Sequence, residues 1–158
     1  MAPDLSGCGD VGVPPGRASQ PYRAWQLALP AAAEAAGLAR RATRDALTAW
    51  RMTCLQDTAV LLVSELVTNA VLHARASASA MLLRLETAGS SLRIEVHDAS
   101  PSWPQPRTPS RTDESGFGFL LVEALADKWG VRDIPPGKAV WAELEARPDG
   151  DRGTAANQ

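Results

Sequence analysis

An apolar segment over residues 55–74 most constrains how this chain can fold. One stripe of the segment carries apolar residues at the spacing of a single helix face, namely Leu62, Leu66 and Ala70. Just before it, Thr53 and Gln56 form a capping-box pattern, which predicts that the helix begins at Thr53. A helix of this length with an apolar stripe needs a hydrophobic surface to cover, and the rest of the chain is expected to supply one.

The other periodic segments predict that this surface is a β-sheet. Apolar and alternating patterns predict strands at residues 22–29, 78–86, 92–97, 130–133 and 138–145. Helical spacing predicts two more helices, at residues 31–50 and 116–129. In the first of them the expected apolar stripe is Leu38, Ala42, Ala46 and Leu47. The order β-α-α-β-β-loop-α-β-β predicts an α+β fold, a two-layer α/β sandwich in which three helices cover one face of a mixed, mostly antiparallel sheet.

Length and composition indicate one soluble globular domain. The chain has 158 residues, of which 45% are hydrophobic and 22% charged. We expect a flexible tail at residues 1–20, the domain at residues 21–146 and a second flexible tail at residues 147–158. The net charge is −2, so no basic excess draws the chain to nucleic acid or to an anionic membrane.

The cysteines and the N-terminus favour a cytoplasmic protein. Cys8 and Cys54 have no metal-ligand neighbours at a suitable spacing, and we expect no disulfide framework. The first residues carry no basic region followed by an apolar one, so they do not resemble a secretory signal. The longest purely aliphatic stretch, residues 59–63, is too short to cross a bilayer.

Polar residues recur on one face of the long helix. Glu65, Asn69 and His73 follow one another at a spacing of four residues, so they share a helix face. They could line a polar cavity, where the Asn oxygen is a suitable ligand for Mg²⁺ and a Glu one turn earlier can accept a proton. They could equally form a solvent-facing stripe, and periodicity alone favours that interpretation.

Three later segments carry weaker signals. Asp98 ends an apolar strand and could accept a hydrogen bond from a base amino group, although an Asp that starts a turn is common. Gly116 and Gly118 open a helix, where free amides favour an anion, yet two glycines alone are weak evidence. The tight turn at residues 136–141 could line a base pocket, but core packing is the simpler interpretation.

Taken together and in this order, these segments resemble the Bergerat (GHKL) ATP-binding fold. The closest resemblance is to the anti-sigma regulatory serine/threonine protein kinases, in particular the short actinobacterial type. The run Glu-Leu-Val-Thr-Asn-Ala-Val-Leu-His-Ala at residues 65–74 corresponds to the N box of that family and is highly specific. The resemblance covers residues 22–144, which is nearly all of the chain that is expected to fold.

The resemblance implies a site for ATP and Mg²⁺. It implies that Glu65 is the catalytic base, that Asn69 coordinates Mg²⁺ and that Asp98 holds the adenine amino group. Residues 99–115 would form a shortened lid over the nucleotide. The start of the following helix would complete the cofactor site with Gly116, Phe117, Gly118, Phe119 and Leu120. Two positions depart from the usual pattern: Ala99-Ser100 follows Asp98 where the family often has a glycine, and Ala139 stands where a Thr is usual.

The implied function is phosphorylation of a serine on an anti-anti-sigma partner of the STAS type, with a sigma factor as the second partner. The alternative is a nucleotide-dependent interaction module with weak or no catalysis. A sensor histidine kinase is less favoured, because the chain is too short to add a phosphoacceptor helix pair. The resemblance implies neither direct nucleic-acid binding nor membrane binding, and it allows a homodimer.

Overall fold

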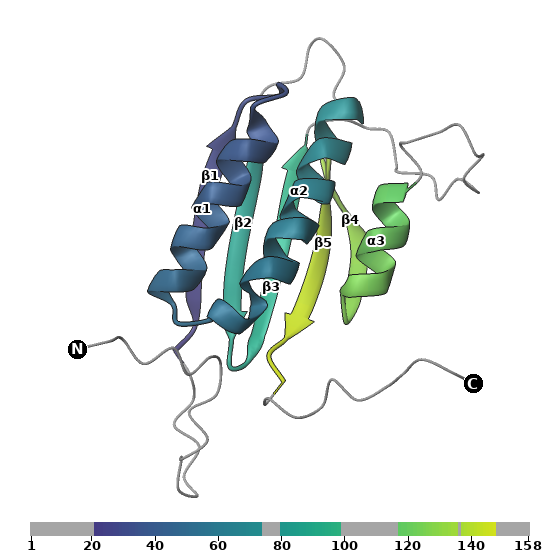
Figure 1. Ribbon diagram of the computed structural model, residues 1–158. Coiled ribbons are helices and arrows are strands. Elements are labelled where there is room, and N and C mark those ends of the chain that lie inside the picture. Colours follow the sequence, from purple (N-terminus) through teal and green to yellow (C-terminus); the bar gives the residue numbers. More distant parts are fainter. Residues whose placement is uncertain (1–20, 74–79, 99–116, 136, 148–158) are drawn as a thin grey trace, which may run out of the picture.

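The chain folds into two layers, a β-sheet and a layer of helices that covers one of its faces (Figure 1). The computed structural model describes residues 21–73, 80–98, 117–135 and 137–147. In chain order the elements are β1 (Arg23–Leu29), α1 (Ala35–Ala49), a 3₁₀ turn η1 (Thr53–Leu55), α2 (Gln56–His73), β2 (Met81–Ala88), β3 (Ser91–Asp98), α3 (Phe117–Leu125), β4 (Lys128–Ile134) and β5 (Gly137–Glu145). The predicted fold class and element order are confirmed.

The sheet is antiparallel throughout its described strands, where a mixed sheet was expected. Its 5 strands lie in the order β1-β2-β3-β5-β4, and each neighbouring pair is antiparallel. A two-residue turn joins β2 to β3, because Ala88 pairs directly with Ser91. Gly89 in this turn has a φ of 62°, a conformation that glycine adopts without steric cost. The turn therefore fixes the register of the central hairpin.

Helix α2 lies across the middle of the sheet and supplies much of the core (Figure 1). Its buried residues are Ala59, Val60, Leu62, Val63, Leu66, Val67 and Ala70, which include the whole predicted stripe. The sheet meets them with the inward residues of its central strands, among them Leu83, Leu85, Ile94 and Val96. By length and composition alone, residues 53–73 could cross a membrane. Here the apolar side of this helix is instead covered by the sheet.

Two details of the helical layer differ from the predictions. Leu38 is 39% exposed, and the buried stripe of α1 is instead Ala35, Ala39, Thr43 and Leu47. Small side chains let α1 lie close to its neighbours, and the Thr43 hydroxyl is satisfied by donating to the Ala39 carbonyl at 2.8 Å. The buried face is therefore rotated away from Leu38.

The capping box at Thr53 and Gln56 is wrong. Residues Thr53–Leu55 form a 3₁₀ turn with no side-chain cap, and α2 begins at Gln56. The Gln56 amide donates to the Arg44 carbonyl at 2.9 Å and to the Thr48 hydroxyl at 3.0 Å. Because its side chain is used to join α2 to the end of α1, it does not fold back on its own helix.

Helix α3 ends earlier than predicted. Trp129 was expected in the helix but lies in β4, which begins at Lys128. The Asp127 amide already donates to the Glu143 carbonyl at 2.9 Å, so pairing with β5 takes over from helical spacing. The Trp129 ring then packs on Phe119 of α3, with the ring centroids 5.4 Å apart.

The expectation for the cysteines is also corrected. Cys54 is disulfide-bonded in the structure, whereas the sequence predicted no disulfide. The other cysteine of the chain, Cys8, lies in residues 1–20 and so outside the described residues. Residues 148–158 of the predicted second tail also lie outside them.

The face of the sheet that the described helices leave uncovered carries an ionic network around Glu95. Glu95 is 4% exposed. It accepts from Arg93 at 2.7 Å and from Arg132 at 3.1 Å, and its other contact is with His97 Nε2 at 2.8 Å. Burial alone would raise the pKa of Glu95, but the hydrogen bonds from His97 and Arg93 and the charges of Arg93 and Arg132 lower it below its ordinary value.

An aromatic contact joins this network to the edge of the sheet. The Arg93 guanidinium lies 4.1 Å from the centroid of the Trp141 ring and also donates to Glu143 at 2.7 Å. The same ring lies against Gly130 of β4, where an added Cβ would lie 2.8 Å from Trp141 Cζ2. The absence of a side chain at Gly130 therefore leaves the space that the ring occupies.

We expect Gly130→Ala to lower the free energy of unfolding by about 1–3 kcal/mol, because the new methyl group must displace the Trp141 ring. Urea unfolding at neutral pH measures the change. Gly37→Ala is the matched control: the nearest atom to its Cβ lies 3.8 Å away, so it should be neutral or slightly stabilising in helix α1. Equal losses in the two variants would contradict the packing argument.

Glu95→Gln should lower the free energy of unfolding by about 2 kcal/mol at pH 7, since a carboxylate is lost from three charged or polar partners. The pKa of Glu95 is lower in the folded protein than in the unfolded chain. The stability that its carboxylate contributes is therefore fully present above the unfolded pKa of about 4.3 and is lost as the pH falls through the folded-state pKa. The difference between wild type and variant should therefore shrink below pH 4. Glu123→Gln, on the exposed side of α3, should show no such difference at any pH.

Candidate functional site

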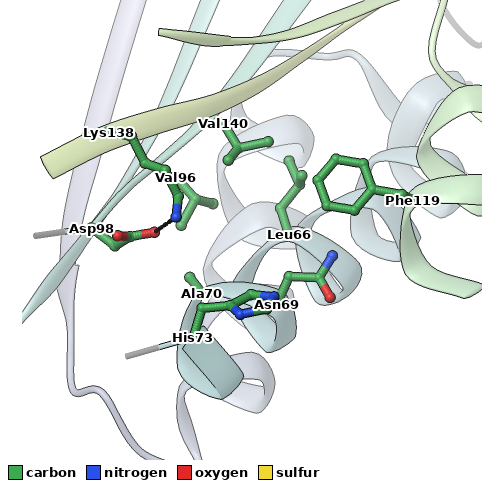
Figure 2. A pocket seen from close by; sticks show the side chains of 9 residues that line it. All are labelled: Leu66, Asn69, Ala70, His73, Val96, Asp98, Phe119, Lys138 and Val140. Carbon is green, nitrogen blue, oxygen red and sulfur yellow. Dashed lines mark ion pairs between the residues drawn. The ribbon is translucent and has the colours of Figure 1, made fainter. Parts of the chain in front are cut away.

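A pocket opens at one end of the two layers, between α2, α3 and the strands β3 and β5 (Figure 2). The enclosed cavity measures about 10 Å³, and the space between its walls amounts to about 290 Å³ when the opening to solvent is included. Its lining residues are Leu66, Asn69, Ala70, His73, Val96, Asp98, Phe119, Lys138 and Val140. All come from segments that are far apart in the sequence, so the pocket exists only in the folded domain.

Helix α2 forms one wall of the pocket. Leu66, Asn69, Ala70 and His73 lie at the spacing i, i+3, i+4 and i+7, which places them along one side of the helix. The first and third are core residues, while Asn69 and His73 bring polar groups to the cavity (Figure 2). The apolar stripe of α2 thus becomes a polar wall in its last two turns.

Asn69 is left with an unsatisfied group. Its Nδ2 atom is buried and has no hydrogen-bond partner among the described residues. Such a group costs about 1–3 kcal/mol, so a folded domain retains it mainly where a ligand satisfies it. A half-turn of the amide exchanges nitrogen for oxygen at almost no change in shape, so Asn69 can present an oxygen to the cavity as well.

The opposite wall carries a buried ion pair. Asp98 ends β3 and is 8% exposed, and Lys138 near the start of β5 is 3% exposed. The two residues face each other across the strand pair, with Lys138 Nζ 3.9 Å from Asp98 Oδ2. Figure 2 shows the lysine side chain reaching down from β5 to the carboxylate. The pair also borders a second, more open hollow of about 180 Å³ beside His97 and Ile134.

Between these polar walls the pocket is apolar. Val96 and Val140 form its floor from the sheet, and Leu66 and Phe119 close it from the two helices (Figure 2). A narrow apolar slot with a carboxylate at its edge suits a flat heterocycle that donates hydrogen bonds from one side. The unsatisfied Asn69 amide lies across the slot from that edge and is suited to a more polar part of the same ligand.

The structure brings three of the sequence-predicted residues together. Asn69, Asp98 and Phe119 line the one pocket although 50 residues separate the first from the last. Glu65 lies one turn before Asn69 on α2 and is partly exposed, but it is not among the lining residues. Leu120 is 47% exposed and is also outside the lining.

The glycine segment is described only in part. Gly116 lies outside the described residues, together with the whole predicted lid at residues 99–115. Phe117 and Gly118 begin the first turn of α3 as backbone, and the lining residue Phe119 follows in the same turn. Their predicted contacts with phosphates therefore stay predictions.

Sequence reasoning missed Lys138 as a site residue. The turn at residues 136–141 was expected mainly as core, whereas Lys138 and Val140 both line the pocket. The available signal was a lysine at the start of an otherwise apolar strand, because lysine is a residue type that is rarely buried. Its significance depends on the pairing of β3 with β5, which a single sequence does not reveal.

The fold and the pocket define a two-layer α/β domain of the GHKL ATP-binding class. Residues 29–144 match the family described as the histidine kinase-like ATPase domain. The match spans most of the chain, and the chain therefore belongs to this family. Membership implies that the domain binds ATP.

A solved structure shows the same fold. The chain is similar to the crystal structure of the RsbU and RsbW domains of Rv1364c from Mycobacterium tuberculosis, with a TM-score of 0.61 and 20% sequence identity. The match covers 78% of this chain and 32% of that chain. At this identity the similarity establishes the fold alone. A comparison with curated protein sequences finds no significant match.

We expect Asn69→Leu to raise the free energy of unfolding of the ligand-free protein by about 1 kcal/mol, because it replaces an unsatisfied buried amide with an apolar group of similar shape. Urea unfolding without nucleotide measures the change. Thr68→Val, at the neighbouring exposed position of the same helix, is the control and should be close to neutral. A loss of stability in Asn69→Leu would mean that the amide is already satisfied within the protein.

Proposed function

We propose that this protein is an ATP-binding anti-sigma regulatory protein that phosphorylates a serine of an anti-anti-sigma partner. The observation that carries the proposal is the pairing, across one pocket, of a buried carboxylate at an apolar slot with an unsatisfied buried amide. The carboxylate of Asp98 suits a nucleotide base that donates hydrogen bonds, and the amide of Asn69 suits the polar, metal-bound end of a nucleotide.

The residues of the pocket then take separate roles. Asp98 accepts from the amino group of the adenine, which lies against Val96, Val140 and Leu66. Asn69 provides an oxygen ligand to Mg²⁺, whose charge lowers the cost of placing a triphosphate beside α2. Gly116, Phe117, Gly118, Phe119 and Leu120 belong to the phosphate side of the site, at the N-terminus of α3.

Phosphotransfer requires a base close to the metal. Glu65 lies one helical turn before Asn69 and is partly exposed, so a serine hydroxyl from a partner can approach it. Glu65 accepts the hydroxyl proton, the serine oxygen forms a bond to the γ-phosphorus, and the bond to the β,γ-bridging oxygen breaks to release ADP. The products are a phosphoserine partner and ADP.

The partners follow from the proposed class. The crystal structure of similar fold contains an RsbW domain beside an RsbU domain. By analogy we propose an anti-anti-sigma protein of the STAS type as the substrate and a sigma factor as the bound partner, with a homodimer as the functional unit. These partners place the protein in the cytoplasm. The disulfide at Cys54 stands against that placement, since a reducing compartment rarely retains one.

One observation favours the alternative, a nucleotide-dependent interaction module without catalysis. Glu65 does not line the pocket that contains Asn69 and Asp98. A catalytic base that lies away from the metal would leave ATP binding intact and phosphotransfer slow. The bound nucleotide would then act by shaping a surface for the partner. The two functions share the pocket and differ only at Glu65.

Calorimetric titration with ATP tests the pocket. The wild type should bind ATP more tightly with Mg²⁺ than without it. Asn69→Ala should abolish most of this Mg²⁺ dependence. Asp98→Asn should weaken binding about tenfold or more with or without the metal, because a charged acceptor for the amino group of the base is replaced by a neutral and weaker one. Unchanged ATP·Mg²⁺ binding in Asn69→Ala would show that the assigned metal role is wrong.

Incubation with labelled ATP and candidate STAS partners separates the two functions. Under the kinase proposal, phosphoserine forms on the partner and falls by about 10²–10⁴-fold in Glu65→Gln, while ATP binding is unchanged. Glu123→Gln on the exposed side of α3 is the matched control and should transfer at the wild-type rate. Tight ATP·Mg²⁺ binding with no transfer to any partner would instead support the interaction module.

A further inference from the structure

The ion pair at the edge of the pocket places two opposite hydrogen-bonding groups side by side. Asp98 and Lys138 are directly opposed in the β3–β5 register, and both side chains are almost fully buried, with 3% and 4% exposure. Their closest charged atoms are 3.9 Å apart, which is longer than a direct hydrogen bond. Both groups also line the pocket. A ligand that reaches this edge therefore meets both of them.

The two groups differ in what they offer. An ionised carboxylate only accepts hydrogen bonds, and an ammonium group only donates them. A purine with a 6-amino group gives a donor at position 6 and an acceptor at the neighbouring ring nitrogen. A purine with a 6-oxo group gives the reverse, an acceptor at position 6 and a donor at the ring nitrogen. With a carboxylate alone, the 6-oxo group would meet a second acceptor and be rejected.

We infer that Lys138 is a specificity-determining residue that lets the base pocket accept 6-oxopurine nucleotides, such as GTP and ITP, as well as ATP. The Lys138 ammonium donates to the 6-oxo group, and Asp98 accepts from the ring N–H beside it. For adenine the two groups contact the opposite positions: Asp98 accepts from the 6-amino group, and the Lys138 ammonium faces the neighbouring ring nitrogen. The inference rests on the proposed nucleotide function of the pocket and adds the class of base to it.

Among the described residues, no other side chain is placed to replace Lys138. The only other ionisable lining residue besides the pair is His73, which comes from α2 on the opposite wall (Figure 2). Arg132 is bonded to Glu95 on the uncovered face of the sheet. Lys128, the only other lysine of the chain, lies exposed at the far end of β4. Removing the Lys138 ammonium should therefore remove the donor at this edge.

Competition calorimetry with ATP, GTP and ITP, each with Mg²⁺, tests the inference. Wild type should bind GTP and ITP within about tenfold of ATP. In Lys138→Met the ratio of the GTP to the ATP dissociation constant should rise at least about tenfold, because the 6-oxo oxygen loses its donor beside a carboxylate, whereas the 6-amino group of adenine keeps Asp98 as its acceptor. Lys138→Arg keeps a donor and should keep the wild-type ratio. Lys128→Met is the matched control and should also keep it.

The outcomes separate the inference from the function on which it rests. If ATP binds but Lys138→Met changes the GTP to ATP ratio by less than tenfold, the inference fails and the nucleotide function stands. If no nucleotide binds to the wild type, both fail. Should Lys138→Met not fold, Lys138→Gln replaces it. Its neutral amide still donates but has no positive charge, so the ratio of the GTP to the ATP dissociation constant should lie between that of wild type and that of a site without a donor. An unchanged ratio would overturn the inference.

Discussion

The packing of α2 against one face of the antiparallel sheet is the interaction on which the rest of this domain depends. One helix fills the centre of the core with its first turns and lines the pocket with its last ones, so stability and ligand binding share a single element. Because the helix is held by close apolar contact along its length, the position of Asn69 is set by buried residues such as Leu62 and Val63, which do not line the pocket. The site is rigid on this side for the same reason that the domain is stable.

The two faces of the sheet differ in their chemistry. The inner face is apolar and covered by helices, while the uncovered face carries charges arranged around the buried Glu95. Strand geometry requires this alternation, since neighbouring residues point to opposite sides. In β3 the consequence is visible within two residues: His97 belongs to the ionic network, and Asp98 belongs to the pocket. A single strand therefore serves both faces without mixing their chemistry.

Much of this architecture follows from sequence, and the exceptions have a common cause. Periodicity identifies the helices and strands, and the N-box resemblance predicts that Asn69 and Asp98 share a site. What escaped prediction depends on tertiary contacts. Gln56 bonds to α1 and not to its own helix, Trp129 leaves a helical pattern because β5 pairs with the chain there, and Lys138 becomes a site residue only through its register with β3. Local sequence patterns do not reveal these tertiary partners.

The pocket gathers the places where regular structure stops or starts. His73 is the last residue of α2, Asp98 is the last of β3, Lys138 is the second of β5, and Phe119 stands in the opening turn of α3. These positions shape the wall of the pocket, whereas the packing of α2 on the sheet is made by residues nearer the middle of each element. The chemistry at the ends of the elements is therefore a better guide to the ligand of such a domain than the resemblance of the whole fold.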